Sequence, residues 1–414
     1  MSNEVFNDEL LREIRSRFCH VDSDPAAGRR VHFESAGGSL KLRAAVQQAA
    51  EIAARPDNAG RDNAASRDLD AIISTGRRDV ALFSGALGGQ IVSGESTTAN
   101  IFRLVEAALA GESGSNVVTT QLEHPCVTSA TKLYAAQYGL QRRVVPITAQ
   151  TGEISPIAIA GQVDDRTAAL VCIHASNVIG TRINIGAVAE QVRRRNPRTL
   201  IVIDGSQHAP HGLIDVESLG IDAYCFAPYK VFSILGTCFA WLSQRLATRE
   251  HPRLLDTPVT QWELGTRDPA AFGAWSAVVD YLVWLSAQLH SADAGRREHV
   301  IRAMSAIDQH ERALGQQLLA GFARIPRLRL IGVPNADERR EAVFAFAIDG
   351  LEAAAVNVAL ADRGIFVHVR RHDAYSGQLL DALHAPDCVR ASFAHYNSPD
   401  EVDSLLEALM EIAY

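Results

Sequence analysis

The sequence predicts an α/β fold, in which a large domain built on a mostly parallel β-sheet is followed by a smaller α+β domain. First, short β-like runs alternate with longer helical patterns, which is the order of βαβ units with parallel strands. Second, the strand-like runs are almost continuously apolar, as expected for a sheet that helices cover on both faces. Third, a long charged helical pattern and a new set of short strands begin after Leu289, which indicates a second domain.

The elements of the large domain follow in chain order. Apolar runs predict strands at residues 90–93, 116–120, 168–174, 199–204 and 223–227. Helical periodicity predicts helices at residues 97–110, 127–138, 186–195 and 270–289. Residues 57–66 are polar, rich in Asn and Arg and without periodicity, so a loop is expected there.

The smaller domain begins with a long helix predicted at residues 296–322. Further strands are expected at residues 327–331, 342–348, 364–369 and 389–393, and further helices at residues 352–362 and 398–412. The predicted division is an N-terminal segment (1–33) that packs on the small domain, a large domain (34–290) and a small domain (291–414).

The composition excludes several classes of protein. The chain has 414 residues with 40 Lys or Arg and 48 Asp or Glu, 21% charged and 47% hydrophobic, which argues against a disordered chain and against a nucleic-acid binder. Residues 270–289 are strongly apolar but contain Asp280, so we interpret them as a buried helix rather than a membrane span. The first residues lack the apolar core of a secretion signal, so a cytoplasmic location is expected.

The cysteines are scattered and form no Cys-x-x-Cys pair. Several lie inside apolar runs, so we expect buried free thiols in a reducing compartment, with no disulfide and no metal site. They are Cys19, Cys126, Cys172, Cys225, Cys238 and Cys388.

The most informative residues for chemistry follow two neighbouring strands. Asp204 ends one apolar strand, and Lys230 follows the next after Pro228 and Tyr229. Ligands of open α/β sheets bind at the carboxyl ends of strands, so both side chains are expected at one crevice. A lysine there can form a Schiff base with pyridoxal phosphate, while an aspartate keeps the pyridine nitrogen protonated. Alternatively, Lys230 is a surface residue and Asp204 a turn residue.

Other segments supply the remaining parts of such a site. Ser96 and Thr97 stand between a strand and a helix, where hydroxyls and backbone N–H groups bind a phosphate; the alternative is an ordinary helix N-cap. Asn177 and Gln207 follow buried strands and could bind the 3′ oxygen of the cofactor ring; the alternative is that both are turn or loop amides.

Seven motifs occur in the order GESTTAN, LEHP, ASNVIGT, DGSQ, PYK, WELGTRD and VRASFAHYN. In this order they resemble the class V aminotransferase and cysteine desulfurase family of pyridoxal-phosphate enzymes, over nearly the whole chain from Glu34 to the C-terminal helix. The resemblance implies the aspartate-aminotransferase type of fold (fold type I), with a sheet of about seven strands in the large, cofactor-binding domain.

The resemblance also implies roles for single residues. Lys230 matches the Schiff-base lysine and Asp204 the partner of the pyridine nitrogen, while Gln207 and Asn177 match neighbours of the 3′ oxygen. His124 matches a histidine that stacks on the ring and moves protons; without the family it would be interpreted as a capping or core histidine.

Further matches concern the phosphate and the substrate. Ser96 and Thr97 match the phosphate-binding turn. Thr266 matches a residue that reaches the phosphate of the partner subunit, which implies a homodimer with shared active sites, although it can also be a plain loop hydroxyl. Arg390 matches the arginine that binds the substrate α-carboxylate; otherwise it would form an ordinary ion pair.

The chain departs from the desulfurase pattern in two places. Tyr229 stands where desulfurases carry a phosphate-binding histidine, and its hydroxyl is a candidate replacement for that cofactor contact. The loop that carries the desulfurase nucleophile lies in residues 364–377 here and contains no cysteine; its neighbourhood holds His372, Asp373, Ala374 and Tyr375. The segment is similar to a desulfurase-like branch with tyrosine in place of this cysteine. The nearest thiols, Cys126 and Cys388, are expected to be packed core thiols.

The predicted function is that of a homodimeric pyridoxal-phosphate enzyme acting on a small amino acid, with no nucleic-acid or membrane partner. A lyase or desulfurase-like reaction that releases a β- or γ-substituent without a persulfide cysteine is preferred. Aminotransfer or epimerisation is the alternative reaction, and a non-catalytic cofactor-binding protein is the alternative of another class. If Arg370 or Arg371 faces the cleft, acidic amino acids should be preferred; otherwise both belong to a solvated basic face.

Overall fold

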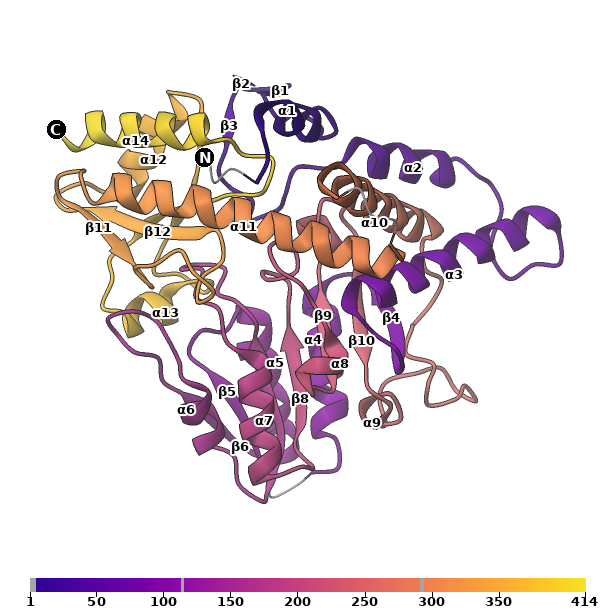
Figure 1. Cartoon of the computed structure of the whole chain (residues 1–414). Helices are drawn as coiled ribbons and strands as arrows, with labels where there is room; N and C mark the ends of the chain where they lie inside the picture. The colour runs from indigo at the N-terminus through magenta and orange to yellow at the C-terminus, as the bar shows by residue number, and fades with distance from the viewer. Residues whose placement is uncertain (1–4, 113–114, 291–293) are drawn as a thin grey trace.

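The computed structural model describes residues 5–112, 115–290 and 294–414, and its largest feature is a seven-stranded sheet (Figure 1). The strand order is β4-β10-β9-β8-β7-β5-β6, and β10 runs antiparallel to both of its neighbours while the other pairings are parallel. The strands are β4 (Gln90–Gly94), β5 (Asn116–Thr120), β6 (Gln141–Val145), β7 (Thr167–Ile173), β8 (Leu200–Asp204), β9 (Ala223–Phe226) and β10 (Cys238–Leu242). The mostly parallel α/β sheet predicted from the sequence is confirmed.

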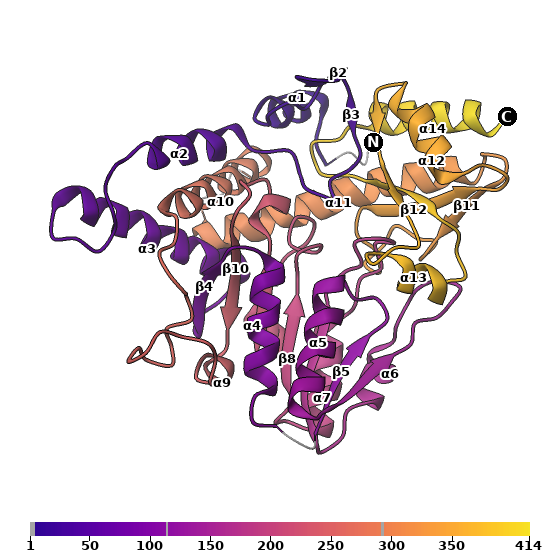
Figure 2. The same ribbon diagram turned by 180° about the vertical axis from the view of Figure 1, so that it is seen from behind.

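Helices cover both faces of this sheet. Figure 2 shows α4 and α5 in front of the strands, and Figure 1 shows α7 and α8 on the opposite face. All residues of β5, β7, β8, β9 and β10 are buried, which explains their continuous apolar character. These helices are α4 (Thr97–Leu109), α5 (Pro125–Tyr138), α6 (Pro156–Gly161), α7 (Ile185–Arg195), α8 (Val216–Leu219) and α9 (Gln244–Ala247).

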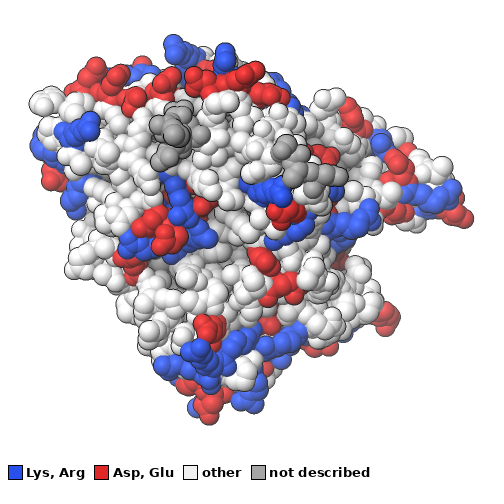
Figure 3. Space-filling view, in the orientation of Figure 1, with Lys and Arg blue, Asp and Glu red and all other residues white. Residues whose placement is uncertain are grey.

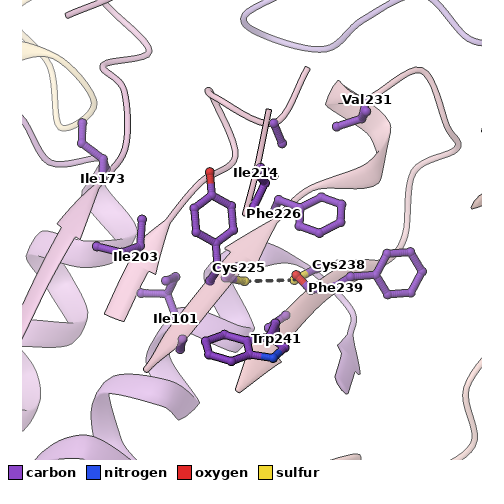
Figure 4. Close-up of a cluster of buried hydrophobic side chains, with 14 of the residues drawn as sticks. Ile101, Ile173, Ile203, Ile214, Cys225, Phe226, Val231, Cys238, Phe239 and Trp241 are labelled. Carbon is purple, nitrogen blue, oxygen red and sulfur yellow. Dashed lines mark hydrogen bonds between the residues drawn. The ribbon is translucent and has the colours of Figure 1, made fainter. Parts of the chain in front are cut away.

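The core beneath β9 and β10 is filled by aromatic and aliphatic side chains (Figure 4). Phe226 and Phe239 are buried there, and their ring centroids lie 6.1 Å apart. The sulfur atoms of Cys225 and Cys238 approach to 3.3 Å as free thiols. The prediction of buried free thiols is confirmed for five of the six cysteines, with Cys19 half-buried.

A helical layer flanks the β4 end of the sheet. Helix α10 (Pro269–Leu289) packs against α2 (Arg43–Ala53), α3 (Ala64–Ser84) and α11 (Arg296–Phe322). Among the helices in the described ranges, α10 alone is long and apolar enough to cross a membrane, but 67% of its most apolar window is buried inside the protein. Its contacts are those of a core helix, as predicted.

The second sheet has four antiparallel strands in the order β11-β12-β15-β14. Its strands are β11 (Leu328–Ile331), β12 (Val343–Ile348), β14 (His368–Arg370) and β15 (Cys388–Ser392). Its helices, besides α11, are α12 (Ala353–Ala361), α13 (Gly377–Ala382) and α14 (Pro399–Ala413). A separate apolar core lies between this sheet and its helices, while α11 contributes its first half to the large core and its second half to the small one. The exact domain boundaries stay a prediction.

The N-terminal residues join the two parts. Helix α1 (Asp8–Ser16) buries Leu11 and Ile14 in the large core, while Arg15 donates to Glu401 of α14 at 2.9 Å. Two short strands follow as a hairpin, and a third one pairs in parallel with residues 365–366. These strands are β1 (Ser23–Asp24), β2 (Gly28–Arg29), β3 (Val31–His32) and β13 (Ile365–Phe366).

Three expectations about single elements were wrong or incomplete. The strand predicted at 364–369 is interrupted at Val367, because β13 pairs with β3 whereas β14 pairs with β15. The loop predicted at 57–66 ends early, because Asn63 caps a helix that begins at Ala64. The sequence analysis also predicted no element at several places where the structure has one, namely the helices α2, α3, α6, α8, α9 and α13, the sheet strands β6 and β10, and the short strands β1, β2 and β3. On the face seen in Figure 3, basic and acidic side chains are interspersed.

Candidate active site

One pocket brings together five of the residues predicted from the sequence. His124, Asn177, Asp204, Gln207 and Lys230 line it, together with Ile173, Ala175 and Ser206. All of them lie at or just after the carboxyl end of β5, β7, β8 or β9, as the topology of open α/β sheets requires.

The carboxylate of Asp204 is held in place at the end of β8. One oxygen accepts a hydrogen bond from the Ser206 backbone N–H at 3.0 Å, and the other accepts from the Cys126 thiol at 3.5 Å. Burial, with Asp204 nearby, raises the pKa of Cys126 far above its usual range, so the thiol stays protonated and acts as a donor. The ligand atoms of His124, Cys126 and Asp204 lie within 4.8 Å of one another, with Cys126 and Asp204 buried and His124 half-buried.

His124 is the N-cap of α5, so the capping alternative is confirmed, and its role toward the cofactor stays a prediction. Its Nδ1 accepts from the Cys126 backbone N–H at 3.2 Å and lies 3.0 Å from the thiol. A neutral His124 therefore carries its proton on Nε2. Burial lowers the pKa of His124, the charge of Asp204 opposes this shift, and the smaller effects of Lys230 and Arg370 add to it.

Lys230 lies in a short 3₁₀ turn (Pro228–Lys230) after β9. Its Nζ donates to Gln207 Oε1 at 3.4 Å. Burial lowers the pKa of Lys230 to about 8, and the negative charge of Asp204 offsets part of that effect. Behind Gln207, His211 is paired with Glu311 at 2.7 Å and lies 3.5 Å from the Gln207 amide, a buried support that the sequence analysis missed.

The predicted phosphate-binding turn lies at the start of α4. Ser96 caps the helix by accepting from the Ala99 N–H at 3.2 Å, and Thr97 Oγ1 is 3.2 Å from Ser206 Oγ. Ser206 thus connects this turn to Asp204. Within the described residues, no hydrogen bond is found for the Tyr229 hydroxyl, whereas the Tyr229 carbonyl accepts from Lys41 Nζ at 2.6 Å.

Arg390, on β15, extends from the small domain to the pocket. It is 2% exposed, and it donates to the Asn177 carbonyl at 2.6 Å and to Glu34 Oε1 at 2.8 Å. Burial lowers its pKa to about 10, with Glu34 opposing this shift. Glu34 was not predicted as a site residue. The signal for it was local: a side-chain Cβ at Gly37 would collide with the Glu34 carboxylate, so the glycine at this position permits the approach.

Thr266 lies apart from the pocket of its own chain. It is exposed, in a segment that runs along edge strand β4, where Glu263 accepts from the Ser93 N–H at 2.7 Å and Arg267 pairs with Glu95 at 2.6 Å. Its predicted contact with a partner subunit therefore stays a prediction.

The loop after β14 brings Tyr375 near His124. The ring centroid of Tyr375 is 6.3 Å from that of His124, and Asp373 accepts from the Tyr375 and Ser376 N–H groups. Cys388 is buried, and burial raises its pKa to about 12. Like Cys126, it is a protonated thiol near neutral pH.

The fold and this set of residues define a pyridoxal-phosphate enzyme of the aspartate-aminotransferase type. The chain belongs to the aminotransferase class-V family, since residues 31–405 match that family. It is 30% identical over 349 residues to probable cysteine desulfurase 2 of Mycobacterium leprae, covering 81% of this chain and 79% of that protein. It is 26% identical over 423 residues to an aminotransferase-like protein of Gibberella zeae, covering 99% of both chains.

Solved structures show the same fold. The apo structure of a cysteine desulfurase from Thermococcus onnurineus has a TM-score of 0.80 at 20% identity, covering 93% of this chain and 94% of that chain. A cysteine desulfurase of Escherichia coli has a TM-score of 0.79 at 22% identity, covering 98% and 99%. The predicted family, fold type and enzyme class are therefore confirmed.

The residues present fit the cofactor on which this family depends. Lys230 offers an amine with a lowered pKa, Asp204 a buried carboxylate, and Thr97 a hydroxyl at a helix N-terminus. An aldehyde, a pyridine nitrogen and a phosphate require these three kinds of group.

Proposed function

We propose that this chain binds pyridoxal phosphate through Lys230, acts as a homodimer, and catalyses a lyase or desulfurase-like reaction on a small amino acid without a persulfide cysteine. The observation that carries the proposal is Lys230 with its lowered pKa in a pocket with Asp204, while neither nearby thiol is a thiolate.

The substrate is bound by the small domain. The Arg390 guanidinium, which contacts the pocket residue Asn177, binds the α-carboxylate, with the Asn177 carbonyl and Glu34 fixing its orientation. Its Nε is buried without a partner, so an N–H remains available for the incoming carboxylate.

Two groups of the chain move protons. Lys230 Nζ removes the proton from the substrate Cα, since a pKa near 8 leaves a usable fraction of neutral amine at neutral pH. His124 carries its proton on Nε2 and donates it to the departing substituent. The cofactor, when bound, supplies the electron sink for bond breaking at Cα, and Asp204 keeps its ring nitrogen protonated.

The departing group leaves without a protein acceptor. Residues 364–377 contain no cysteine, and the ring of Tyr375 lies near that of His124. A phenol does not accept sulfur as a thiolate does, so the product is released to solution.

Aminotransfer is the second candidate, because the aminotransferase-like relative from Gibberella zeae matches along 99% of the chain. It uses the same residues, as does epimerisation, and differs in where the proton returns. A non-catalytic role has no support, since the relatives are enzymes of this family.

A panel of amino acids tests the reaction. Purified holoenzyme is mixed with each one, and the cofactor absorbance is followed while pyruvate, alanine, sulfide, sulfite and keto acids are assayed. We expect a β- or γ-substituent in solution together with a keto acid, because a substituent that leaves with its bonding electrons leaves an unsaturated amino acid, which hydrolyses to a keto acid and ammonia. Stoichiometric conversion of the cofactor to its amino form, reversed by a keto acid, would instead establish aminotransfer.

Dimerisation and location complete the proposal. Thr266 is exposed, as a residue offered to a partner subunit must be. All six cysteines are free, which supports a cytoplasmic location. A monomer in solution with full activity would contradict the shared site.

A further inference from the structure

Two arginines lie on one face of the β14–β15 pair. Arg370 is opposite Cys388 in the register, and Arg390 lies two residues farther along the same strand as Cys388, so side-chain alternation places both arginines on one side. Val369 and Val389 point the other way, into the core of the small domain, whereas Cys388 belongs to the core of the large domain. The face with the arginines is therefore turned toward the large domain and its pocket.

Arg370 is buried but only partly satisfied. It is 8% exposed, and its Nε donates to Ser376 Oγ at 2.7 Å. Its Nη2 is buried and has no hydrogen-bond partner in the structure. The next residue, Arg371, is exposed.

The charged groups around Arg370 favour the binding of an anion. The positive charge of Arg370 lowers the pKa of both Arg390 and His124, so the two arginines and the pocket lie in one region of positive potential. The negative charges of Asp373 and Glu34 raise the pKa of Arg370 and offset part of this potential, but Glu34 already accepts a hydrogen bond from Arg390. No ion pair joins Arg370 to a carboxylate of the described residues, and a buried guanidinium N–H without a partner costs free energy that an anion would recover.

We propose that Arg370 binds a second anionic group, carried by the side chain of the substrate, so that the enzyme selects amino acids with an acidic side chain. The inference rests on the proposed function in one respect, since it assigns the α-carboxylate to Arg390. Arg371 takes no part, because its side chain is in solvent.

Binding of unreactive acids tests this without turnover. Isothermal titration of the holoenzyme with succinate, which has two carboxylates, and with butyrate, which has one on a chain of equal length, measures the contribution of the second anion. We expect succinate to bind at least about tenfold more tightly. Titration with 3-sulfinopropionate shows whether a sulfinate can take the place of the second carboxylate.

The variants assign this difference to one residue. Arg370→Ala should weaken succinate about tenfold or more and leave butyrate unchanged, Arg371→Ala should change neither, and Arg390→Ala should weaken both. Equal affinity of the wild type for the two acids, or an equal loss of both in Arg370→Ala, would overturn the inference.

Two precautions keep the result decisive. If thermal melting shows that Arg370→Ala is unfolded, Arg370→Lys keeps the charge but not the planar fork and should lose part of the succinate preference. If no amino acid gives a product, the proposed reaction fails while the succinate preference still decides the role of Arg370.

Discussion

The lowered pKa of Lys230 makes a quantitative prediction about cofactor loading. An ordinary lysine with a pKa of 10.5 is about 0.1% neutral near pH 7.5, whereas a lysine with a pKa of about 8 is about one quarter neutral. Since only the neutral amine attacks an aldehyde, the rate of pyridoxal-phosphate incorporation should be higher by about 200-fold than for an exposed lysine at that pH.

The assay is the rate at which apoprotein takes up pyridoxal phosphate between pH 6 and 10, followed by borohydride reduction and peptide mapping. The rate should rise with pH to a plateau with its midpoint near 8, because deprotonation produces the reactive form. The Asp204 carboxylate raises this pKa, so Asp204→Asn should move the midpoint to lower pH.

Lys41 provides a matched control. Burial lowers its pKa also to about 8, but its Nζ donates to the Tyr229 carbonyl rather than facing Asp204. The reduced cofactor should map to Lys230 in the wild type and in Lys41→Ala, and be lost in Lys230→Ala. A midpoint at pH 10 or above, or labelling of Lys41, would refute the reasoning.

Three further predictions concern the dimer, the thiols and stability. Mixing Lys230→Ala with Thr266→Ala subunits should give hybrid dimers whose activity differs from that of either homodimer, and unchanged activity on mixing would argue against a shared site. Cys126→Ala and Cys388→Ala should retain turnover with no trapped persulfide, because both thiols are buried and protonated; a persulfide on either, with activity lost on its replacement, would identify the nucleophile. Glu341 is buried and accepts from His208 at 2.6 Å, and its pKa is lowered to about 2 mainly by the charges of His208 and Arg182 against the opposing effect of burial. Glu341→Gln should lower the free energy of unfolding by about 3 kcal/mol at neutral pH, and because the folded-state pKa is depressed, the difference should shrink as pH falls from 4.5 toward 2 in chemical denaturation; a pH-independent difference would contradict it.

The strands that carry the pocket were predictable because they are buried on both faces. β5 was predicted with its observed bounds and β8 with a one-residue error, and the position of Asp204 at a strand end follows from them. β6 was missed because it is an edge strand with the sequence QRRVV and only one fully buried residue, so it gives neither an apolar run nor a clear alternation.

The partners of the site residues were less predictable than the residues themselves. Arg390 and Glu34 are separated by 356 residues, and no local pattern joins them. The same holds for His211 and Glu311, which are 100 residues apart. Such pairs depend on how the two domains pack, which the sequence pattern of each domain does not contain.

The choice between Arg370 and Arg371 shows what a register adds to a sequence pattern. Strand alternation alone requires that these neighbours point to opposite sides, so one of them was expected to be solvated. If residues from 364 onward formed one continuous strand, the sequence would not tell which arginine faces the large domain, because alternation alone does not fix the side on which the strand's first residue lies. The break at Val367 starts a new pairing in which His368 lies opposite Arg390, and Arg370, two residues on, shares the face of Arg390. The side-chain specificity that we propose therefore depends on the pairing that follows this break, and moving the register by one residue would place Arg371 on the face of Arg390 and Arg370 on the opposite face.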